Sequence, residues 1–140
     1  MPTSWPTAHA SASLALAWVA ARRKDSVGLQ LAHDALTEAA GLGLRPFAAE
    51  ALELLASQEA DGSRNPEVAR LLGAAAAARA EMGLRWRYPY HQVAVDAVYE
   101  RLREALGEDP FEAELREGAD ISFEEAIVVA QRMWRTPLRH

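Results

Sequence analysis

The sequence predicts an all-α fold of about seven helices, stacked as antiparallel hairpins in an α-solenoid or a helical bundle. The apolar half of its 140 residues is mostly Ala and Leu, which head the helix-propensity ranking. Apolar residues recur at helical spacing, and no stretch alternates with period two for long enough to make a strand. Glycines, prolines and capping residues separate these stretches at helix-length intervals. A chain of this length fits one domain.

An arm, a single domain and a short tail make up the expected organisation. Two prolines within residues 1–7 predict an extended arm, with Trp5 docked on the helices that follow. Helical periodicity begins at about Ala8. We therefore expect a single helical-repeat domain over residues 8–135 and a tail over 136–140.

The first expected helix runs from about residue 8 to residue 23. A second begins after Asp25 or Ser26, either of which can cap it, and Gly41 and Gly43 end it. The expected inward stripes are Leu14, Ala17, Trp18 and Ala21 in the first helix, and Val27, Leu31, Ala35, Ala39 and Leu42 in the second.

The third expected helix begins at Pro46 and stops at residues 61–63. In the fourth, Asn65 can cap the helix, Pro66 fits its first turn and Gly83 can close it. Alanine covers the remaining faces of the fourth helix, which lets neighbouring helices approach from more than one side. It is therefore expected in the middle of the stack. The inward residues are Leu52 and Leu55 in the third helix, and Val68, Leu71, Leu72, Ala75 and Met82 in the fourth.

Three further helices are expected after residue 90. The fifth ends at Gly107, and the sixth runs from about 109 to 118. Residues 122–125, Ser-Phe-Glu-Glu, form a capping box that begins the seventh.

A weak internal repeat supports stacking. When residues 29–45 are aligned with 69–85, an offset of 40, both segments end in Gly-Leu-Arg. That offset covers two helices and two turns, which is the size of one divergent helical-hairpin repeat. Chance agreement is the alternative in so alanine-rich a chain.

The formal net charge of −5 argues against nucleic acid as a direct partner, because phosphate binding needs a basic face. Residues 96–125 hold eleven acidic residues against three arginines, a local balance of −8. This acidic block is either a solvated helical surface or a docking face for a basic partner.

The sequence contains no constellation that indicates catalysis. Cysteine is absent, which excludes disulfides, thiolate metal sites and Cys nucleophiles. The four histidines are scattered without the spacing of a metal site, and no phosphate-binding loop or nucleophile elbow occurs. We therefore expect a non-enzymatic chain that holds no metal and no cofactor.

The apolar segment near the N-terminus has the wrong form for a signal peptide or a membrane span. Residues 14–21 lack a preceding basic region, are followed by residues 22–24, Arg-Arg-Lys, and are too short to cross a bilayer. We expect a cytoplasmic protein without membrane association.

The loop over residues 84–90 is the best candidate surface for recognition. Its binding candidates are Trp86, Arg87, Tyr88 and Tyr90. Aromatic residues and arginine are enriched at binding hot spots. The alternative is that Trp86 and the tyrosines fold back and seal the gap between the fourth and fifth helices.

An ordered set of residues in the second half resembles a known protein region. The set contains Ala69-Arg70-Leu71-Leu72-Gly73-Ala74-Ala75, Arg79, Gly83, Tyr99-Glu100-Arg101, Leu106-Gly107, Phe111, Gly118, Ser122 and Glu124-Glu125-Ala126. It resembles the end of the tetratricopeptide-like helical region in bacterial signal-transduction ATPases, such as MalT-like LuxR-family transcriptional regulators and ATPase–adenylate cyclase fusions. The resemblance implies a sensor or protein-interaction arm. It does not extend to the ATPase or DNA-binding modules of those proteins.

Three hypotheses for function follow. The first is a non-catalytic interaction or sensor domain of a bacterial transcriptional regulator, binding a protein partner or other domains of the same regulator. The second is a module that encloses a small effector between helices, and the third is a structural cap or homodimerisation segment of a longer solenoid. A concave groove favours the first, an enclosed cavity the second, and a flat apolar end face near Leu14 and Trp18 the third.

Overall fold

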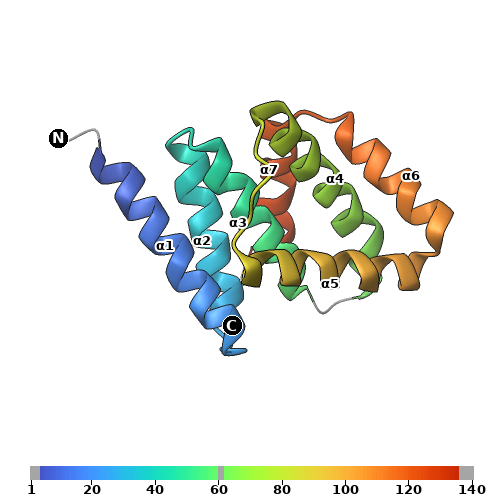
Figure 1. Cartoon of the computed structure of the whole chain (residues 1–140), viewed down its shortest axis with the longest axis horizontal. Helices are drawn as coiled ribbons and strands as arrows, with labels where there is room; N and C mark the ends of the chain where they lie inside the picture. The colour runs from blue at the N-terminus through green and yellow to red at the C-terminus, as the bar shows by residue number, and fades with distance from the viewer. Residues whose placement is uncertain (1–3, 60–61, 136–140) are drawn as a thin grey trace.

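The computed structural model of the chain describes residues 4–59 and 62–135, and these residues form seven α-helices and no strand (Figure 1). The all-α prediction is confirmed. A 3₁₀ turn, Gly62–Arg64, precedes the fourth helix. The helices are α1 (Ser4–Arg22), α2 (Gly28–Gly41), α3 (Arg45–Gln58), α4 (Asn65–Met82), α5 (Pro89–Leu106), α6 (Glu108–Ala119) and α7 (Phe123–Met133).

Helices α1 to α4 lie side by side, each packed on the next, with α3 near the centre (Figure 1). Helix α5 crosses the ends of this row, contacting α3 and α4, and α6 packs back against α4. Helix α7 then returns to contact α2, α3 and α4. In an open solenoid each repeat touches only its neighbours, so this closure is that of a helical bundle.

The expected N-terminal arm is wrong for the residues that the structure describes there. Residues 4–7 form the first turn of α1, where the fixed φ of Pro6 suits a helix and its missing N–H costs no hydrogen bond. Trp5 is 74% exposed, so the expectation that it docks on the helices is also wrong. Residues 1–3 and the expected tail, 136–140, lie outside the described residues.

Two helix-level expectations also need correction. Val27 and Leu42 flank α2 and are exposed, whereas Ala32 and Leu36 are buried beside Ala35 and Ala39. The reason is that α2 packs between α1 and α3, so its buried arc is wider than one stripe. Asn65 lies inside α4 rather than capping it, because the 3₁₀ turn leads directly into the helix.

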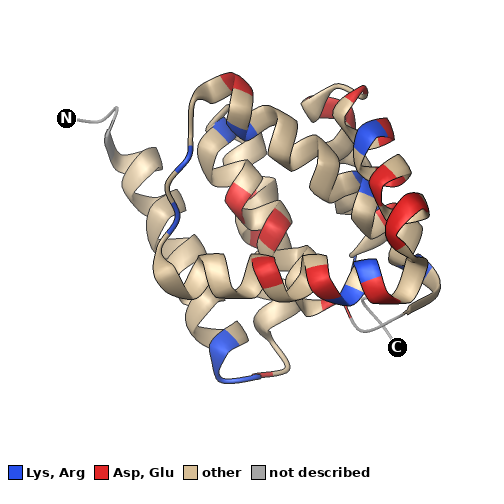
Figure 2. Cartoon of the chain, turned by 45° about the vertical axis from the view of Figure 1, so that its right-hand side comes forward, with Lys and Arg blue, Asp and Glu red and all other residues tan. Residues whose placement is uncertain are grey.

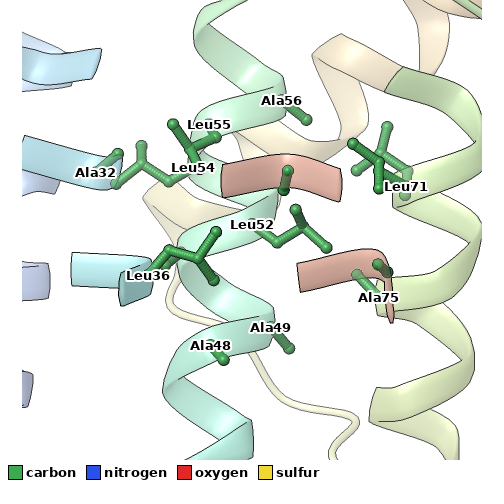
Figure 3. Packing of buried hydrophobic residues seen from close by; sticks show 14 of the residues in the cluster. Ala32, Leu36, Ala48, Ala49, Leu52, Leu54, Leu55, Ala56, Leu71 and Ala75 are labelled. Carbon is green, nitrogen blue, oxygen red and sulfur yellow. The ribbon is translucent and has the colours of Figure 1, made fainter. Parts of the chain in front are cut away.

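The core is centred on α3, which contacts α1, α2, α4, α5 and α7. Leucines 52 and 55 point inward as predicted, and Leu54 is buried as well (Figure 3). A helix surrounded in this way is buried on most of its faces. The buried residues of α3 are Ala48, Ala49, Ala51, Leu52, Glu53, Leu54, Leu55 and Ala56.

Two glycines allow the close crossing of α4 and α6. A Cβ added to Gly73 would lie 2.2 Å from the carbonyl oxygen of Leu115, and one added to Gly118 would lie 1.8 Å from the carbonyl oxygen of Arg70. Both distances are far below van der Waals contact, so the backbones touch only because these side chains are absent. The prediction that α4 lies within the stack is confirmed by burial on several of its faces.

The two Gly-Leu-Arg triplets end their helices in the same way. The amide N–H of Leu44 donates to the carbonyl of Ala39 at 2.9 Å, and that of Leu84 donates to Arg79 at 2.9 Å. Gly43 and Gly83 adopt left-handed φ values of 71° and 74°. The equivalence stops there, because α3 begins at once at Arg45 whereas α5 begins only at Pro89.

Candidate functional site

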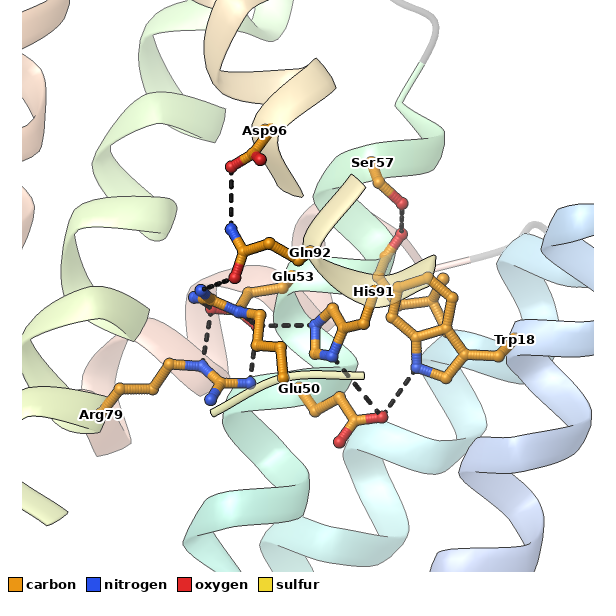
Figure 4. Close-up of polar contacts among 10 residues, drawn as sticks. Trp18, Glu50, Glu53, Ser57, Arg79, His91, Gln92 and Asp96 are labelled. Atoms are coloured by element: carbon orange, nitrogen blue, oxygen red, sulfur yellow. Dashed lines mark hydrogen bonds and ion pairs between the residues drawn. The ribbon is translucent and has the colours of Figure 1, made fainter. Parts of the chain in front are cut away.

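A buried charge cluster on α3 organises the region around the predicted loop. The Glu53 carboxylate accepts two hydrogen bonds from Arg79 of α4, each 2.9 Å long (Figure 4). Arg87 of the loop donates to it through Nη2 at 2.7 Å, and Nε2 of His91 on α5 lies 2.9 Å from Oε1. Side chains from α3, α4, the loop and α5 therefore meet at one carboxylate, and we call this group the Glu53 cluster.

The Glu53 cluster keeps its carboxylate ionised despite burial. Burial alone would raise the pKa of Glu53, but hydrogen bonds from His91, Arg87 and Arg79 outweigh it and lower the pKa to about 2. For Arg87, burial lowers the pKa, and the hydrogen bonds and charge of Glu53 more than compensate, so its pKa is raised. The charges stabilise one another in an interior where an unpaired charge is costly.

Further polar contacts tie the Glu53 cluster to α1 and along α5. The indole N–H of Trp18 donates to Glu50 at 2.8 Å, and the same carboxylate lies 4.0 Å from Nδ1 of His91 (Figure 4). Arg87 also donates to the side chain of Gln92 at 3.0 Å. These contacts fix the path of the loop between α4 and α5.

Three aromatic side chains form a continuous strip that runs from the outside of this loop to the start of α5. Trp86 is 67% exposed and Tyr88 is 51% exposed, and their rings meet edge to face with centroids 4.6 Å apart. Tyr88 in turn stacks on Tyr90 at 5.6 Å with an interplanar angle of 9°. We call Trp86, Tyr88 and Tyr90 the aromatic strip.

The four predicted binding residues thus divide between two environments. Trp86 and Tyr88 point outward, so the alternative that they fold back to seal the helices is wrong. Arg87, between them, points inward to Glu53, as the alternation of side chains in an extended segment requires. Tyr90 is half-buried and packs edge to face on Trp18 at 5.4 Å. Their role in binding stays a prediction.

An open groove of about 630 Å³ begins where the aromatic strip ends. It lies between α1, α3 and α5, and its volume falls within the roughly 300–1,000 Å³ usual for ligand sites. Arg22 stands over the Tyr90 ring, 5.1 Å from its centroid, and within the described part of the chain makes no ion pair. The lining residues, which define the α1–α5 groove, are Trp18, Ala21, Arg22, Ser57, Gln58, Tyr90, Val93, Ala94, Ala97, Val98 and Arg101.

Charge is separated across the molecule. Figure 2 shows acidic residues gathered on α5 and α6 and basic residues at the C-terminal end of α1. Several of the acidic side chains pair locally on the surface, as Glu100 and Glu108 do with Arg103 at 3.1 and 3.2 Å. This arrangement is that of a solvated face with its own counter-ions. The other interpretation, a docking face for a basic partner, stays a prediction.

The Glu53 cluster was missed by the sequence reasoning, although a signal for it exists. Glu53 is the single charge within Leu-Glu-Leu-Leu, and Arg79 is the single charge within a run of alanines. A charge in an otherwise apolar helix indicates a buried partner. The sequence does not indicate which residues pair, because their positions depend on how three helices cross.

Neither metal ligands nor membrane spans emerge from the described residues. Over 4–59 and 62–135, no three His, Cys, Asp or Glu side chains gather in a way that could hold a metal ion. Within the same ranges, no helix combines the length and apolar character needed to cross a membrane.

Together these features describe an all-helical bundle that carries an exposed aromatic strip beside an open groove. Curated proteins similar to the chain include "Putative HTH-type transcriptional regulator Mb0914c" of Mycobacterium bovis and "Putative HTH-type transcriptional regulator Rv0890c" of Mycobacterium tuberculosis. Each is 37% identical over 112 residues, which is 80% of this chain and 13% of the relative. The chain therefore spans about an eighth of the length of these relatives. No protein-family model matches the chain. No solved structure matches it significantly.

Proposed function

We propose that this chain is a non-catalytic interaction and sensor domain of a cytoplasmic bacterial transcriptional regulator. It binds a segment of a partner protein, or of the same regulator, through the aromatic strip and the α1–α5 groove. The observation that carries the proposal is that Trp86 and Tyr88 stay exposed while Arg87 between them is anchored on Glu53. Preorganised aromatic side chains lose little entropy on binding, which makes them effective contacts.

Two comparisons support the regulator part of the proposal. The named relatives are described as transcriptional regulators and share 37% identity over most of this chain. The order of residues from Ala69 to Ala126 resembles the tetratricopeptide-like arm of MalT-like LuxR-family regulators. Signal transduction by such an arm occurs through binding. ATP hydrolysis and DNA contact lie outside the proposal.

The chemistry of the surface defines the expected partner. The α1–α5 groove is lined mainly by apolar side chains, and Arg22 lies on its rim, followed by Arg23 and Lys24. These are exposed cations in a protein of net charge −5. We expect a segment with apolar or aromatic side chains next to Asp or Glu, because charge complementarity speeds and orients docking. The open shape of the groove favours such a segment over an enclosed small effector.

Selection from a random dodecapeptide phage library tests the proposal. The chain is immobilised, and enriched peptides are synthesised and titrated by fluorescence anisotropy. We expect peptides rich in aromatic and acidic residues. Their affinity should fall at least about tenfold when Trp86→Ser and Tyr88→Ser are combined, since such a loss corresponds to one hot-spot contact.

The matched control is Val129→Ser, which removes an exposed apolar side chain from α7 at the other side of the core. It should leave peptide affinity unchanged. Trp86 and Tyr88 are both exposed, so their replacement should not alter the circular dichroism melt. Enrichment of peptides that bind the double variant as tightly as the original chain would contradict the proposal.

A further inference from the structure

Helix α5 presents a long row of side chains to the α1–α5 groove. The row consists of Tyr90, Val93, Ala94, Ala97 and Arg101. Spacings of three, one, three and four residues place these side chains on one face of the helix. Val93 is 68% exposed, so apolar surface is open to solvent within the row. At a rise of about 1.5 Å per residue the row is about 16 Å long, which gives room for about three turns of a second helix.

Most polar side chains of the groove wall are already bonded within the molecule. The Ser57 hydroxyl donates to a backbone carbonyl of α3 at 2.7 Å, and the Gln58 amide donates to the carbonyl of Gly28 at 3.4 Å. The Arg101 guanidinium donates to the carbonyl of Glu59 at 2.6 Å. These donors are therefore directed to carbonyls of the chain itself and not into the space of the groove.

An extended segment would find no backbone hydrogen-bond partners in such a groove. Backbone N–H and C=O groups that are taken out of water need partners. An extended peptide usually obtains them from the edge of a sheet, and the described residues contain no strand. An α-helix satisfies its own backbone groups except at its ends. A helix is therefore the form of polypeptide that suits this groove.

Arg22 is the exception among the polar side chains of the groove. It is exposed, and its guanidinium stands over the ring of Tyr90 at the start of the α5 row. Of the described residues that line the groove, none is Asp or Glu, and none accepts a hydrogen bond from this guanidinium. A carboxylate brought by a partner would supply the missing counter-ion, and pairs of arginine with carboxylate are among the stronger hydrogen-bonded pairs.

We infer that the segment bound in the α1–α5 groove is an amphipathic α-helix that lies along α5 and pairs an Asp or Glu with Arg22. Its apolar side chains, at positions i, i+4 and i+7, fill the groove between Trp18 and Ala97. The small side chains of Ala94 and Ala97 let the two helix axes approach to about 8–10 Å. The carboxylate of the bound helix lies at the end nearest Tyr90, because Arg22 stands over that ring. The inference rests on the proposed function and specifies the form of its partner.

NMR chemical shifts of a bound peptide test its form. The probe is the tightest peptide selected from the dodecapeptide library, synthesised with ¹³C and ¹⁵N labels. On addition of the full chain, its Cα signals should shift in the direction typical of α-helix. Proline at a central position where Ala leaves the affinity unchanged should weaken binding at least about tenfold, because proline breaks a helix. A peptide that binds in extended form, or that tolerates proline there, would overturn the inference.

Charge reversal tests the pairing with Arg22. Arg22→Glu should raise the Kd of the same peptide at least about tenfold, because like charges then face each other. Replacing the peptide's acidic residue by Arg should restore its affinity for the Arg22→Glu chain. The control is Arg116→Glu, which makes the same change of charge at an exposed site on α6, outside the groove, and should change the Kd by no more than about twofold.

The outcomes separate this inference from the proposed function. Equal effects of the two charge variants, or a reversed peptide that does not recover its affinity for Arg22→Glu, would overturn the inference and leave the proposed function intact. If no peptide is enriched, or if affinity does not depend on Trp86 and Tyr88, the proposed function fails and the inference fails with it. Arg22 is exposed, so its variant should keep the helical fold, which circular dichroism measures.

Discussion

Glu53 lies between two leucines in the middle of α3, yet its carboxylate is ionised at neutral pH because three donors hold it. The same carboxylate anchors Arg87, and Arg87 holds the loop that presents the aromatic strip. A buried residue thus determines the position of exposed ones.

Replacing Glu53 by Gln tests this role. The substitution removes the negative charge but leaves the buried guanidinium of Arg79 and the half-buried one of Arg87. This should lower the free energy of unfolding by about 3–5 kcal/mol. Urea unfolding followed by circular dichroism measures the change. The matched control is Glu124→Gln, which breaks an exposed ion pair with Arg45 and should cost roughly 0–1 kcal/mol. Equal effects of the two variants would contradict the role of Glu53.

The pH dependence of stability should reveal the titration of Glu53 in the folded chain. The pKa of Glu53 is lowered from 4.5 to about 2, so its contribution is complete above pH 4.5 and is lost as pH falls toward 2. The stability gap between the original chain and Glu53→Gln should therefore close over that range, by on the order of 3 kcal/mol. Urea titrations of both chains at several pH values measure it. A gap that stays constant down to pH 2 would show that Glu53 does not titrate as its contacts require.

Single residues could be predicted from the sequence where they are apolar and lie within one helix, but not where several elements meet. The apolar positions Leu52, Leu55 and Leu71 were correctly placed inside, because burial follows from periodicity within one helix. The Glu53 cluster was not predicted, because its members come from α3, α4, the loop and α5. Alternation in the extended loop places Trp86 and Arg87 on opposite sides, but Arg87 is the one that points inward because of Glu53, a partner that only the tertiary structure supplies.

The helices themselves were largely predictable because local signals mark their ends. Gly83 closes α4 in a left-handed conformation, and Ser122 caps α7 by accepting the amide N–H of Glu125 at 3.0 Å. The packing of α5 to α7 was not predictable in the same way. It depends on the backbone contact of α4 and α6 at Gly73 and Gly118, which is a long-range property.

Gly73→Ala tests that contact. An added methyl group would meet the carbonyl of Leu115, and a backbone atom cannot move aside as a side chain can. We expect a loss of roughly 1–3 kcal/mol even after the gain in helix propensity. The control is Gly41→Ala, where no atom lies within 4 Å and the change should be neutral or slightly stabilising. Calorimetric melting of both variants gives the result, and a Gly73→Ala chain as stable as the original would contradict the close crossing.

The whole molecule presents distinct surfaces on either side of α1. One side contributes Trp18 and Arg22 to the α1–α5 groove, and the other exposes Trp5, Leu16 and Val19. Under the proposed function, the groove and the aromatic strip together bind a segment of a partner protein or of the same regulator. In this account the chain contributes to function by binding. The Glu53 cluster holds in place the loop that carries the aromatic strip.

The four tryptophans provide a direct measurement of the central claim, because each indole N–H reports one region in a two-dimensional ¹H–¹⁵N NMR spectrum. Trp86 reports the aromatic strip, Trp18 the groove and Trp5 the N-terminal end of α1, while Trp134 is buried beside α7 with its N–H donated to Glu59. On titration with the tightest selected peptide, the account predicts that the signals of Trp86 and Trp18 shift together and that the Trp134 signal stays in place. A peptide that shifts Trp5 or Trp134 while leaving Trp86 and Trp18 unchanged would contradict the account.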